Sequence, residues 1–232
     1  MVNHCMQHRC RACLQILLES LVERTECVAL LLSHLQDQPT IIRYEDNPVN
    51  FRHQRAAEVT SVRDILVVLR QSLNEILRPF TPCQALRKIG FVGENQFQYK
   101  VYGTPVGMPN ALFSFYTTMR ISITALHRQY NVISYQTIEG SLYTSFKIMY
   151  ANAQLGCFIF VFNDRVYGRA CRLVRTLRTA GQGIPRSCWS VYKNNCPEDD
   201  MLIFERQCRL LISSVAVSSV CCMLTGRGWS QC

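Results

Sequence analysis

Two histidines and three cysteines near the start of the chain have the side-chain types of a metal site: His4, Cys5, His8, Cys10 and Cys13. Cys10 and Cys13 are separated by two residues, which is typical of zinc ligands. Structural zinc sites, however, usually take two ligands from each of two separated segments, and the later cysteines are too widely spaced to supply a second pair. We therefore predict that this segment begins a helix and binds no metal.

Three arginines later in the chain are the second candidate for function. Arg165, Arg169 and Arg172 recur at helical spacing, which places them on one face of a helix predicted over residues 165–180 and ended by Gly181. A guanidinium group forms paired hydrogen bonds with a carboxylate or phosphate. We predict that this face binds an acidic protein partner, because no aromatic side chains lie between the arginines to stack on nucleic-acid bases. The alternative is a face that only contacts solvent.

The sequence contains no recognised catalytic motif. A glycine-rich phosphate loop, a nucleophile elbow and an HExxH motif are all absent. His34, His53 and His127 lie far apart, and His127 is expected to be a hydrogen-bonded core residue. The pattern argues against a hydrolase or transferase and predicts no cofactor, although catalytic groups can converge from distant positions.

The secondary structure around these candidates is predicted most clearly between residues 111 and 150. From Phe113 to Ala125 the odd positions are mainly apolar and the even positions mainly polar, so one face of an extended strand is buried. A second alternating run follows at 142–150, and the continuous apolar run at 157–162 is typical of a strand buried on both faces. The predicted fold class is α+β, with an antiparallel sheet or partial β-barrel flanked by helices.

The patterns before and after the sheet indicate the domain organisation. Apolar residues recur at helical spacing in residues 12–35 and again in residues 62–77. We predict a single α+β domain over 1–180, whose helical part, sheet and arginine-bearing helix occupy residues 12–90, 96–162 and 165–180. Residues 181–232 mix Cys, Ser, Gly and Trp without strong periodicity, so we expect a weakly ordered, cysteine-rich tail.

The composition of the chain indicates the kind of partner it binds and the cellular compartment in which it works. The 232 residues carry a formal net charge of +9, which favours acidic partners such as nucleic acid or an acidic protein face. The thirteen cysteines are odd in number and irregular in spacing, and Met1–Arg11 lacks the apolar region of a secretory signal. We therefore expect the nucleus, or else the cytoplasm, with buried cysteines acting as small apolar side chains. No apolar run is long enough to span a membrane.

A further set of short motifs lies between residues 40 and 150. They are Ile42-Arg43-Tyr44, Pro48, Leu86, Ile89-Gly90-Phe91, Phe97, Lys100, Gly103, Met119-Arg120-Ile121, Ile123 and the run Ser141–Ile148. This set resembles subunit eighteen of Mediator, a head-module component of the RNA polymerase II transcription coactivator. The resemblance implies an antiparallel β-barrel flanked by helices, pairing with the related subunit twenty, and tethering through a helix of subunit eight.

The sequence therefore predicts a non-catalytic subunit that works through protein–protein interaction. The resemblance places that subunit in a nuclear assembly that regulates transcription. The alternative function is a basic nucleic-acid-binding protein that uses an arginine-rich surface. No catalytic, cofactor-binding or metal-binding residue is predicted.

Overall fold

The computed structural model describes residues 42–77, 82–105, 107–108 and 110–224, with side chains described up to residue 215. The described secondary structure belongs to one compact unit that begins at Arg43. The histidine and cysteine cluster at the start of the chain and the helix predicted at 12–35 lie outside the described residues. Within the described part, no helix is long and apolar enough to cross a membrane.

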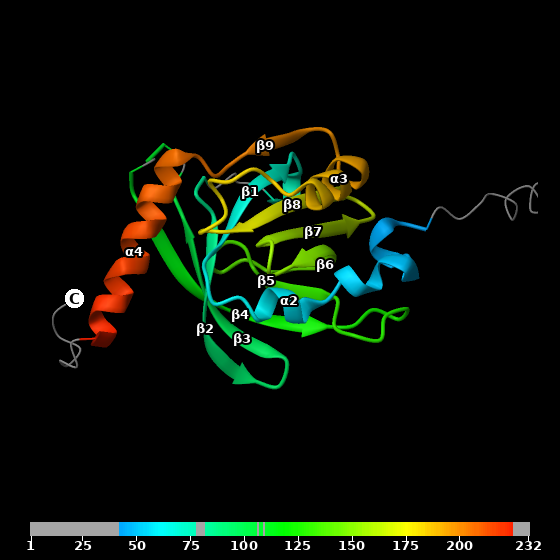
Figure 1. Cartoon of the computed structure of the whole chain (residues 1–232), viewed down its shortest axis with the longest axis horizontal. Helices are drawn as coiled ribbons and strands as arrows, with labels where there is room; N and C mark the ends of the chain where they lie inside the picture. Colours follow the sequence, from blue (N-terminus) through cyan, green and yellow to red (C-terminus); the bar gives the residue numbers. More distant parts are fainter. Residues whose placement is uncertain (1–41, 78–81, 106, 109, 225–232) are drawn as a thin grey trace, which may run out of the picture. The chain divides into compact units, whose positions relative to one another are not determined.

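Eight antiparallel strands form a closed β-barrel (Figure 1). From β2 to β8 each strand pairs with the next one in sequence, and β1 closes the ring by pairing with both β8 and β2. The barrel strands are β1 Leu66–Ser72, β2 Ala85–Gly93, β3 Gln96–Gly103, β4 Phe113–Ser122, β5 Val132–Gln136, β6 Tyr143–Asn152, β7 Cys157–Asp164 and β8 Gly168–Thr176. A short ninth strand, β9 (Asp200–Leu202), pairs with the end of β1. Closure leaves no free edge along most of the sheet.

Alternation along the strands separates the barrel interior from its outer surface. In β4, Phe115 and Met119 belong to the interior cluster of buried residues, whereas Tyr116 and Arg120 are exposed. The alternating strand predicted here is therefore confirmed. The same period of two holds around the ring and gives the barrel an apolar interior.

A second apolar core covers the outside of β7 and β8. Phe158 and Phe160 point into the barrel, while Ile159 and Val161 point outward into this second core. The helix α3 (Arg186–Asn195) contacts the outer surface of β7, and α4 (Arg206–Leu224) follows β9. The prediction of a strand buried on both faces at 157–162 is confirmed.

Short helices cover one end of the barrel. They are the 3-10 helices η1 (Tyr44–Asp46) and η2 (Pro48–His53) and the α-helix α2 (Ala56–Thr60), and all three contact β6. Ala56 and Val59 of α2, and Val62 after it, belong to the same cluster as the barrel interior, so this segment closes the end with apolar side chains.

Three disulfides join the later part of the chain to the barrel. Cys157–Cys188 and Cys171–Cys196 connect β7 and β8 to α3 and to the residue that ends it, and Cys83–Cys208 connects the start of β2 to α4. Disulfides form and persist in oxidising compartments. The expectation of reduced cysteines in the nucleus or cytoplasm is therefore wrong.

Two segments predicted as helices are strands. Residues 62–77 contain β1, and residues 165–180 contain β8. Both faces of these strands are buried, so apolar residues follow one another closely and also fit a helical period. The five-residue apolar run at Ile65–Leu69, which includes three β-branched residues, is the better guide to β1.

The fold class is therefore mainly β rather than α+β. The predicted antiparallel sheet is confirmed, and the barrel is closed rather than partial. Past residue 180 the described chain forms α3, β9 and α4, and all three disulfides cross that position. The division into a domain ending at residue 180 and a tail stays a prediction, although these cross-links favour one unit.

Candidate functional site

A small polar cluster lies inside the apolar barrel. Arg172, in β8, is only 1% exposed. Its Nε donates a hydrogen bond to Gln71 Oε1 at 2.7 Å, and its Nη1 donates to the hydroxyl of Tyr135 at 3.0 Å. The guanidinium carbon also lies 5.1 Å from the ring centroid of Phe146, a cation–π contact. The barrel interior therefore holds a buried positive charge.

The strand geometry explains why Arg172 points inward. Ala170 and Val174, two residues to either side of it, belong to the interior cluster. Gln71 is the register partner of Arg172 on β1, and its own amide donates to the carbonyl of Leu77 at 3.0 Å. The orientation of the guanidinium is thus fixed from β1, β5 and β8.

Tyr99 adds an unsatisfied hydrogen-bonding group to this interior. The side chain is 1% exposed, and its hydroxyl has no hydrogen-bond partner among the described residues. Burial, and then the neighbouring Tyr135, raise the pKa of Tyr99 far above its usual value, so the hydroxyl is a neutral donor. An unpaired buried hydroxyl costs about 1–3 kcal/mol. We call Gln71, Tyr99, Tyr135 and Arg172 the interior polar cluster.

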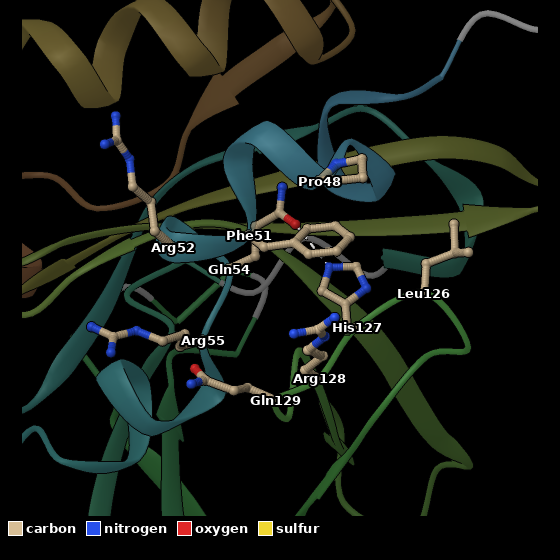
Figure 2. Close-up of a pocket in the computed structure, with 9 residues that line it drawn as sticks. All are labelled: Pro48, Phe51, Arg52, Gln54, Arg55, Leu126, His127, Arg128 and Gln129. Carbon is tan, nitrogen blue, oxygen red and sulfur yellow. Dashed lines mark hydrogen bonds between the residues drawn. The ribbon is translucent and has the colours of Figure 1, made fainter.

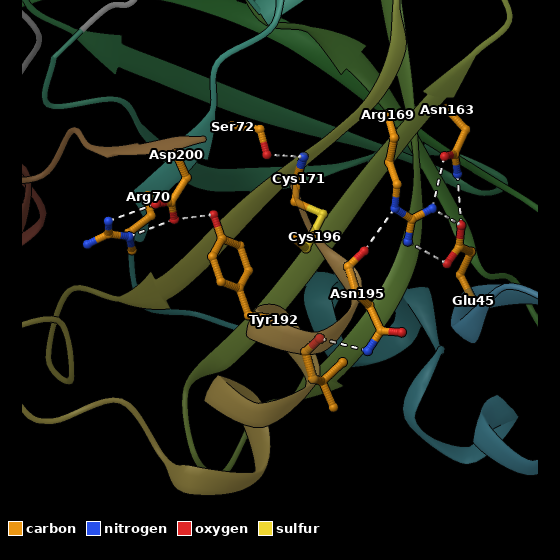
Figure 3. The surroundings of a disulfide bond; sticks show 11 residues. Glu45, Arg70, Ser72, Asn163, Arg169, Cys171, Tyr192, Asn195, Cys196 and Asp200 are labelled. Atoms are coloured by element: carbon orange, nitrogen blue, oxygen red, sulfur yellow. Dashed lines mark hydrogen bonds and ion pairs between the residues drawn. A yellow bond between two sulfur atoms is a disulfide. The ribbon is translucent and has the colours of Figure 1, made fainter. Parts of the chain in front are cut away.

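No buried carboxylate of the described residues faces the interior polar cluster. Glu45 is the only buried acidic residue in the described part of the chain. Arg169 donates to both of its oxygens at 2.6 and 2.9 Å, and Asn163 donates at 2.8 Å (Figure 3). Burial acts to raise the pKa of Glu45, but the hydrogen bonds from Arg169 and Asn163 outweigh it and lower the pKa overall. This network lies on the outward positions of β7 and β8.

The three arginines predicted as one binding face are not brought together. Arg172 lies inside the barrel, Arg169 pairs with Glu45 outside it, and Arg165 is exposed in the turn between β7 and β8. The common helical face is wrong because the segment is a turn and a strand. Partner binding by the three residues stays a prediction without the face on which it rested.

A surface pocket of about 700 Å³ lies between η2 and the loop from β4 to β5 (Figure 2). The rings of Phe51 and His127 are in contact at its wall, with centroids 3.9 Å apart and planes tilted by 31°. The two ring nitrogens of His127 form hydrogen bonds with Thr124 Oγ1 at 2.9 Å and Gln54 Oε1 at 2.8 Å. Burial, the largest effect, lowers the pKa of His127 and favours the neutral ring. His127 is buried and hydrogen-bonded, as predicted, but it lies in the loop after β4 beside this surface pocket rather than in an apolar core.

The basic residues around this pocket do not converge on one point. Arg52 and Arg55 extend from the ribbon in different directions in Figure 2. Arg55 donates to Glu58 Oε1 at 2.6 Å, which occupies part of its guanidinium. The interior polar cluster is the better candidate site, because its groups meet inside a closed barrel.

Comparison with known proteins gives a family match. Residues 93–210, which are 118 of the 232 residues, match the family model described as tick histamine binding protein. The matched span runs from the last residue of β2 into α4 and includes Arg172. Comparison with curated proteins finds no match.

Two solved structures align with this chain at low sequence identity. Japanin from Rhipicephalus appendiculatus, bound to cholesterol, is 14% identical with a TM-score of 0.46, and the alignment covers 63% of this chain and 96% of japanin. AM182, in a crystal structure with serotonin, is 9% identical with a TM-score of 0.47, over 71% of this chain and 90% of AM182.

The family match overturns the resemblance to Mediator subunit eighteen. The motifs behind that resemblance are short apolar alternations, which antiparallel barrels share whatever their origin. Pairing with Mediator subunits twenty and eight, a role in transcription and a nuclear location are therefore wrong. The nucleic-acid alternative has no support either, since Arg169 and Arg172 are committed to contacts within the protein.

Sequence reasoning found one member of the interior polar cluster and missed three. Arg172 was named for a different reason, and Gln71 was hidden because β1 was predicted as helix. Tyr99 and Tyr135 sit at inward positions of their strands, next to polar residues at outward positions. A tyrosine at an inward position of an alternating strand was the signal available for both, because a buried tyrosine usually needs a partner for its hydroxyl.

Proposed function

The chain belongs to the tick histamine-binding protein family, and we propose that it binds one small, largely apolar molecule inside its barrel. The interior of an eight-stranded barrel is just wide enough to be filled by side chains or to hold one small ligand. Aromatic and aliphatic side chains line this interior, with a few polar groups at fixed positions. Such a lining is typical of small-molecule sites. In this proposal the protein binds its ligand and does not transform it.

The buried guanidinium of Arg172 carries the proposal about ligand chemistry. Histamine is a cationic amine at neutral pH, and inside the barrel it would meet Arg172, whereas Glu45, the one buried acidic residue of the described chain, pairs with Arg169 outside the barrel. Two unit charges 5 Å apart repel by on the order of 3 kcal/mol at an effective dielectric constant of 20. A carboxylate gains a similar amount and accepts hydrogen bonds from Arg172 and Tyr99. We propose a ligand with an apolar body and a carboxylate or other acceptor group.

Cross-linking by three disulfides favours a site of action in an oxidising compartment. We propose that the protein works outside the reducing interior of the cell. The ligand would then be a small molecule of the extracellular medium. This location is consistent with a protein that holds a ligand rather than one that assembles with a transcription complex.

Native mass spectrometry of the purified full chain tests the proposal with three probes. They are a long-chain fatty carboxylate, the alcohol of the same chain length, and histamine. We expect one carboxylate per chain, weaker retention of the alcohol, and no retained histamine. Preferential retention of histamine would overturn the charge assignment, and failure of all three to bind would overturn the proposed ligand class.

A further inference from the structure

The outer surface of β2 to β4 carries cations without acidic partners. Arg87, Lys100 and Arg120 point outward, because the residue next to each of them belongs to the interior cluster. The four ion pairs among the described residues include none of the three. Residues 86–138 contain a single carboxylate, Glu94, in the turn between β2 and β3.

Two of these cations lie directly opposite each other. Arg87 on β2 is the register partner of Lys100 on β3. Directly opposite side chains of an antiparallel pair have Cβ atoms about 4.5–5.5 Å apart, and like charges in this position destabilise the pair. A bound anion would attract both cations and so offset the repulsion between them.

Exposed tyrosine rings accompany the cations. Lys100 Nζ lies 5.6 Å from the ring centroid of Tyr102 and 5.4 Å from that of Tyr116, and the guanidinium carbon of Arg120 lies 4.8 Å from that of Tyr143. Tyr116 is 59% exposed and Tyr143 is 39% exposed. Flat apolar rings are thus available beside the positive charges. We call Arg87, Lys100, Tyr116, Arg120 and Tyr143 the cation–tyrosine face.

The cation–tyrosine face is open and extended. The helices η1, η2, α2 and α3 pack on β6 and β7, and Tyr116 and Arg120 on β4 are exposed. Tyr116 is the register partner of Lys100, and Arg120 lies four residues farther along β4, at about 13 Å for a strand. Charges repeated over this length suit an extended polyanion better than one small anion.

We propose that the cation–tyrosine face binds an acidic polysaccharide. Sulfate or carboxylate groups of the polysaccharide pair with Arg87, Lys100 and Arg120, and its sugar rings lie on Tyr116 and Tyr143. Clustered basic residues attract polyanions of this kind. The disulfides favour an oxidising compartment, in which acidic polysaccharide rather than nucleic acid is the expected extended polyanion. The face is on the outside of the barrel, so this inference does not depend on the proposed function.

Binding of the full chain to immobilised dextran sulfate, with uncharged dextran as reference, tests the inference over a series of salt concentrations. The test variant is Arg87→Gln/Lys100→Gln/Arg120→Gln. The matched control, Arg128→Gln/Arg165→Gln/Arg178→Gln, removes three exposed positive charges elsewhere. We expect salt-sensitive binding by the wild type and a loss of roughly 10- to 100-fold in the test variant, with little loss in the control. Tyr116→Ala should weaken binding several-fold without changing its salt dependence.

Three outcomes would overturn the inference. The first is an equal loss in both triple variants, which would mean that only net charge matters. The second is a single-stranded DNA of similar charge density binding the face as tightly as dextran sulfate, and the third is equal binding to uncharged dextran. Thermal unfolding shows whether the test variant folds, and the single variants Arg120→Gln and Tyr116→Ala at exposed positions decide the question if it does not. Retention of the fatty carboxylate should be the same in all these variants.

Discussion

Polar groups inside the barrel reduce the stability of the empty protein. Removing a guanidinium from water costs several kcal/mol unless its hydrogen bonds are replaced, and Arg172 has found partners in Gln71 and Tyr135. Tyr99 has no partner at all among the described residues. Residues that break local stability rules in this way are expected at functional sites. Their free-energy cost is understandable if a ligand supplies the missing acceptor.

The hydroxyl of Tyr99 gives the first prediction. Tyr99→Phe should leave the thermal stability of the empty protein unchanged or raise it, because it removes an unpaired buried donor. The same change should weaken binding of the fatty carboxylate. Tyr192→Phe is the matched control, since the hydroxyl of Tyr192 donates to Asp200 at 2.8 Å and its loss should cost about 1.5–3 kcal/mol. Thermal unfolding with and without ligand measures both, and a clear loss of stability in Tyr99→Phe would show that the hydroxyl has a partner.

The carboxylate of Asp200 gives a prediction about pH. The hydrogen bond from Arg70 is the largest effect and, with that from Tyr192, it lowers the pKa of Asp200 against the opposing effect of burial. The folded pKa therefore lies below the unfolded value near 4, so stability from this carboxylate is present above pH 4 and lost as the pH falls through the folded pKa. Asp200→Asn should lower stability at pH 7 by about 1.5–3 kcal/mol and reduce its loss in acid. Urea unfolding from pH 7 to pH 3 measures the effect, and an unchanged pH dependence would contradict it.

At the scale of elements, disulfides hold the covering helices to the barrel. Hydrogen bonds next to Cys171–Cys196 add to this attachment. Arg169 Nε donates to the carbonyl of Asn195 at 2.9 Å, and the amide of Cys171 donates to Ser72 Oγ at 2.9 Å (Figure 3). The outer core of β7 and β8 is complete only when α3 lies on it.

Removal of the longest cross-link gives the third prediction. Cys83 and Cys208 are separated by 125 residues, so their disulfide constrains most of the unfolded barrel. Cys83→Ala/Cys208→Ala should lower the free energy of unfolding by about 2–4 kcal/mol. Denaturant unfolding under non-reducing conditions measures the change, and peptide mapping of the unreduced wild type should recover the Cys83–Cys208 pair. Free thiols at both positions in the native protein would contradict the prediction.

The strands also show which parts of the fold could be predicted from the sequence. Strands such as β4 bury one face, so their alternation was plain and the antiparallel sheet was predicted. Strands β1 and β8 bury both faces, and their apolar runs fit a helical period as well as a strand. Closure into a barrel was missed for the same reason, because β1 is the strand that joins β8 to β2.

The candidate site was less accessible to prediction than the strands. Arg172 was read as part of a basic surface because its inward direction depends on the correct assignment of β8. The disulfides were missed because their partners are 25 to 125 residues apart, and spacing alone does not determine pairing. Only the three-dimensional register brings Gln71 and Arg172 side by side.

At the scale of the molecule, the two proposals give one disulfide-linked barrel two separate sites, an interior that selects a ligand and an outer wall that contacts a polyanion. The two sites lie on opposite sides of the barrel wall and have only β3 in common, so variants at one should leave the other unchanged. Additive effects are expected for residues that are well separated and share no partners. The combined variant Arg172→Met/Arg120→Gln should show the sum of the two single effects on each binding reaction.

The proposed function depends on selection of an acceptor group by Arg172 inside the barrel. Isothermal titration of the fatty carboxylate and the matching alcohol into the wild type, Arg172→Met and the exposed control Arg165→Met tests it most directly. We predict that the wild type and Arg165→Met prefer the carboxylate by roughly 10- to 100-fold, as expected for a charge-assisted hydrogen bond. In Arg172→Met that preference should disappear while the alcohol still binds. An unchanged preference in Arg172→Met, with the fold intact, would contradict the account.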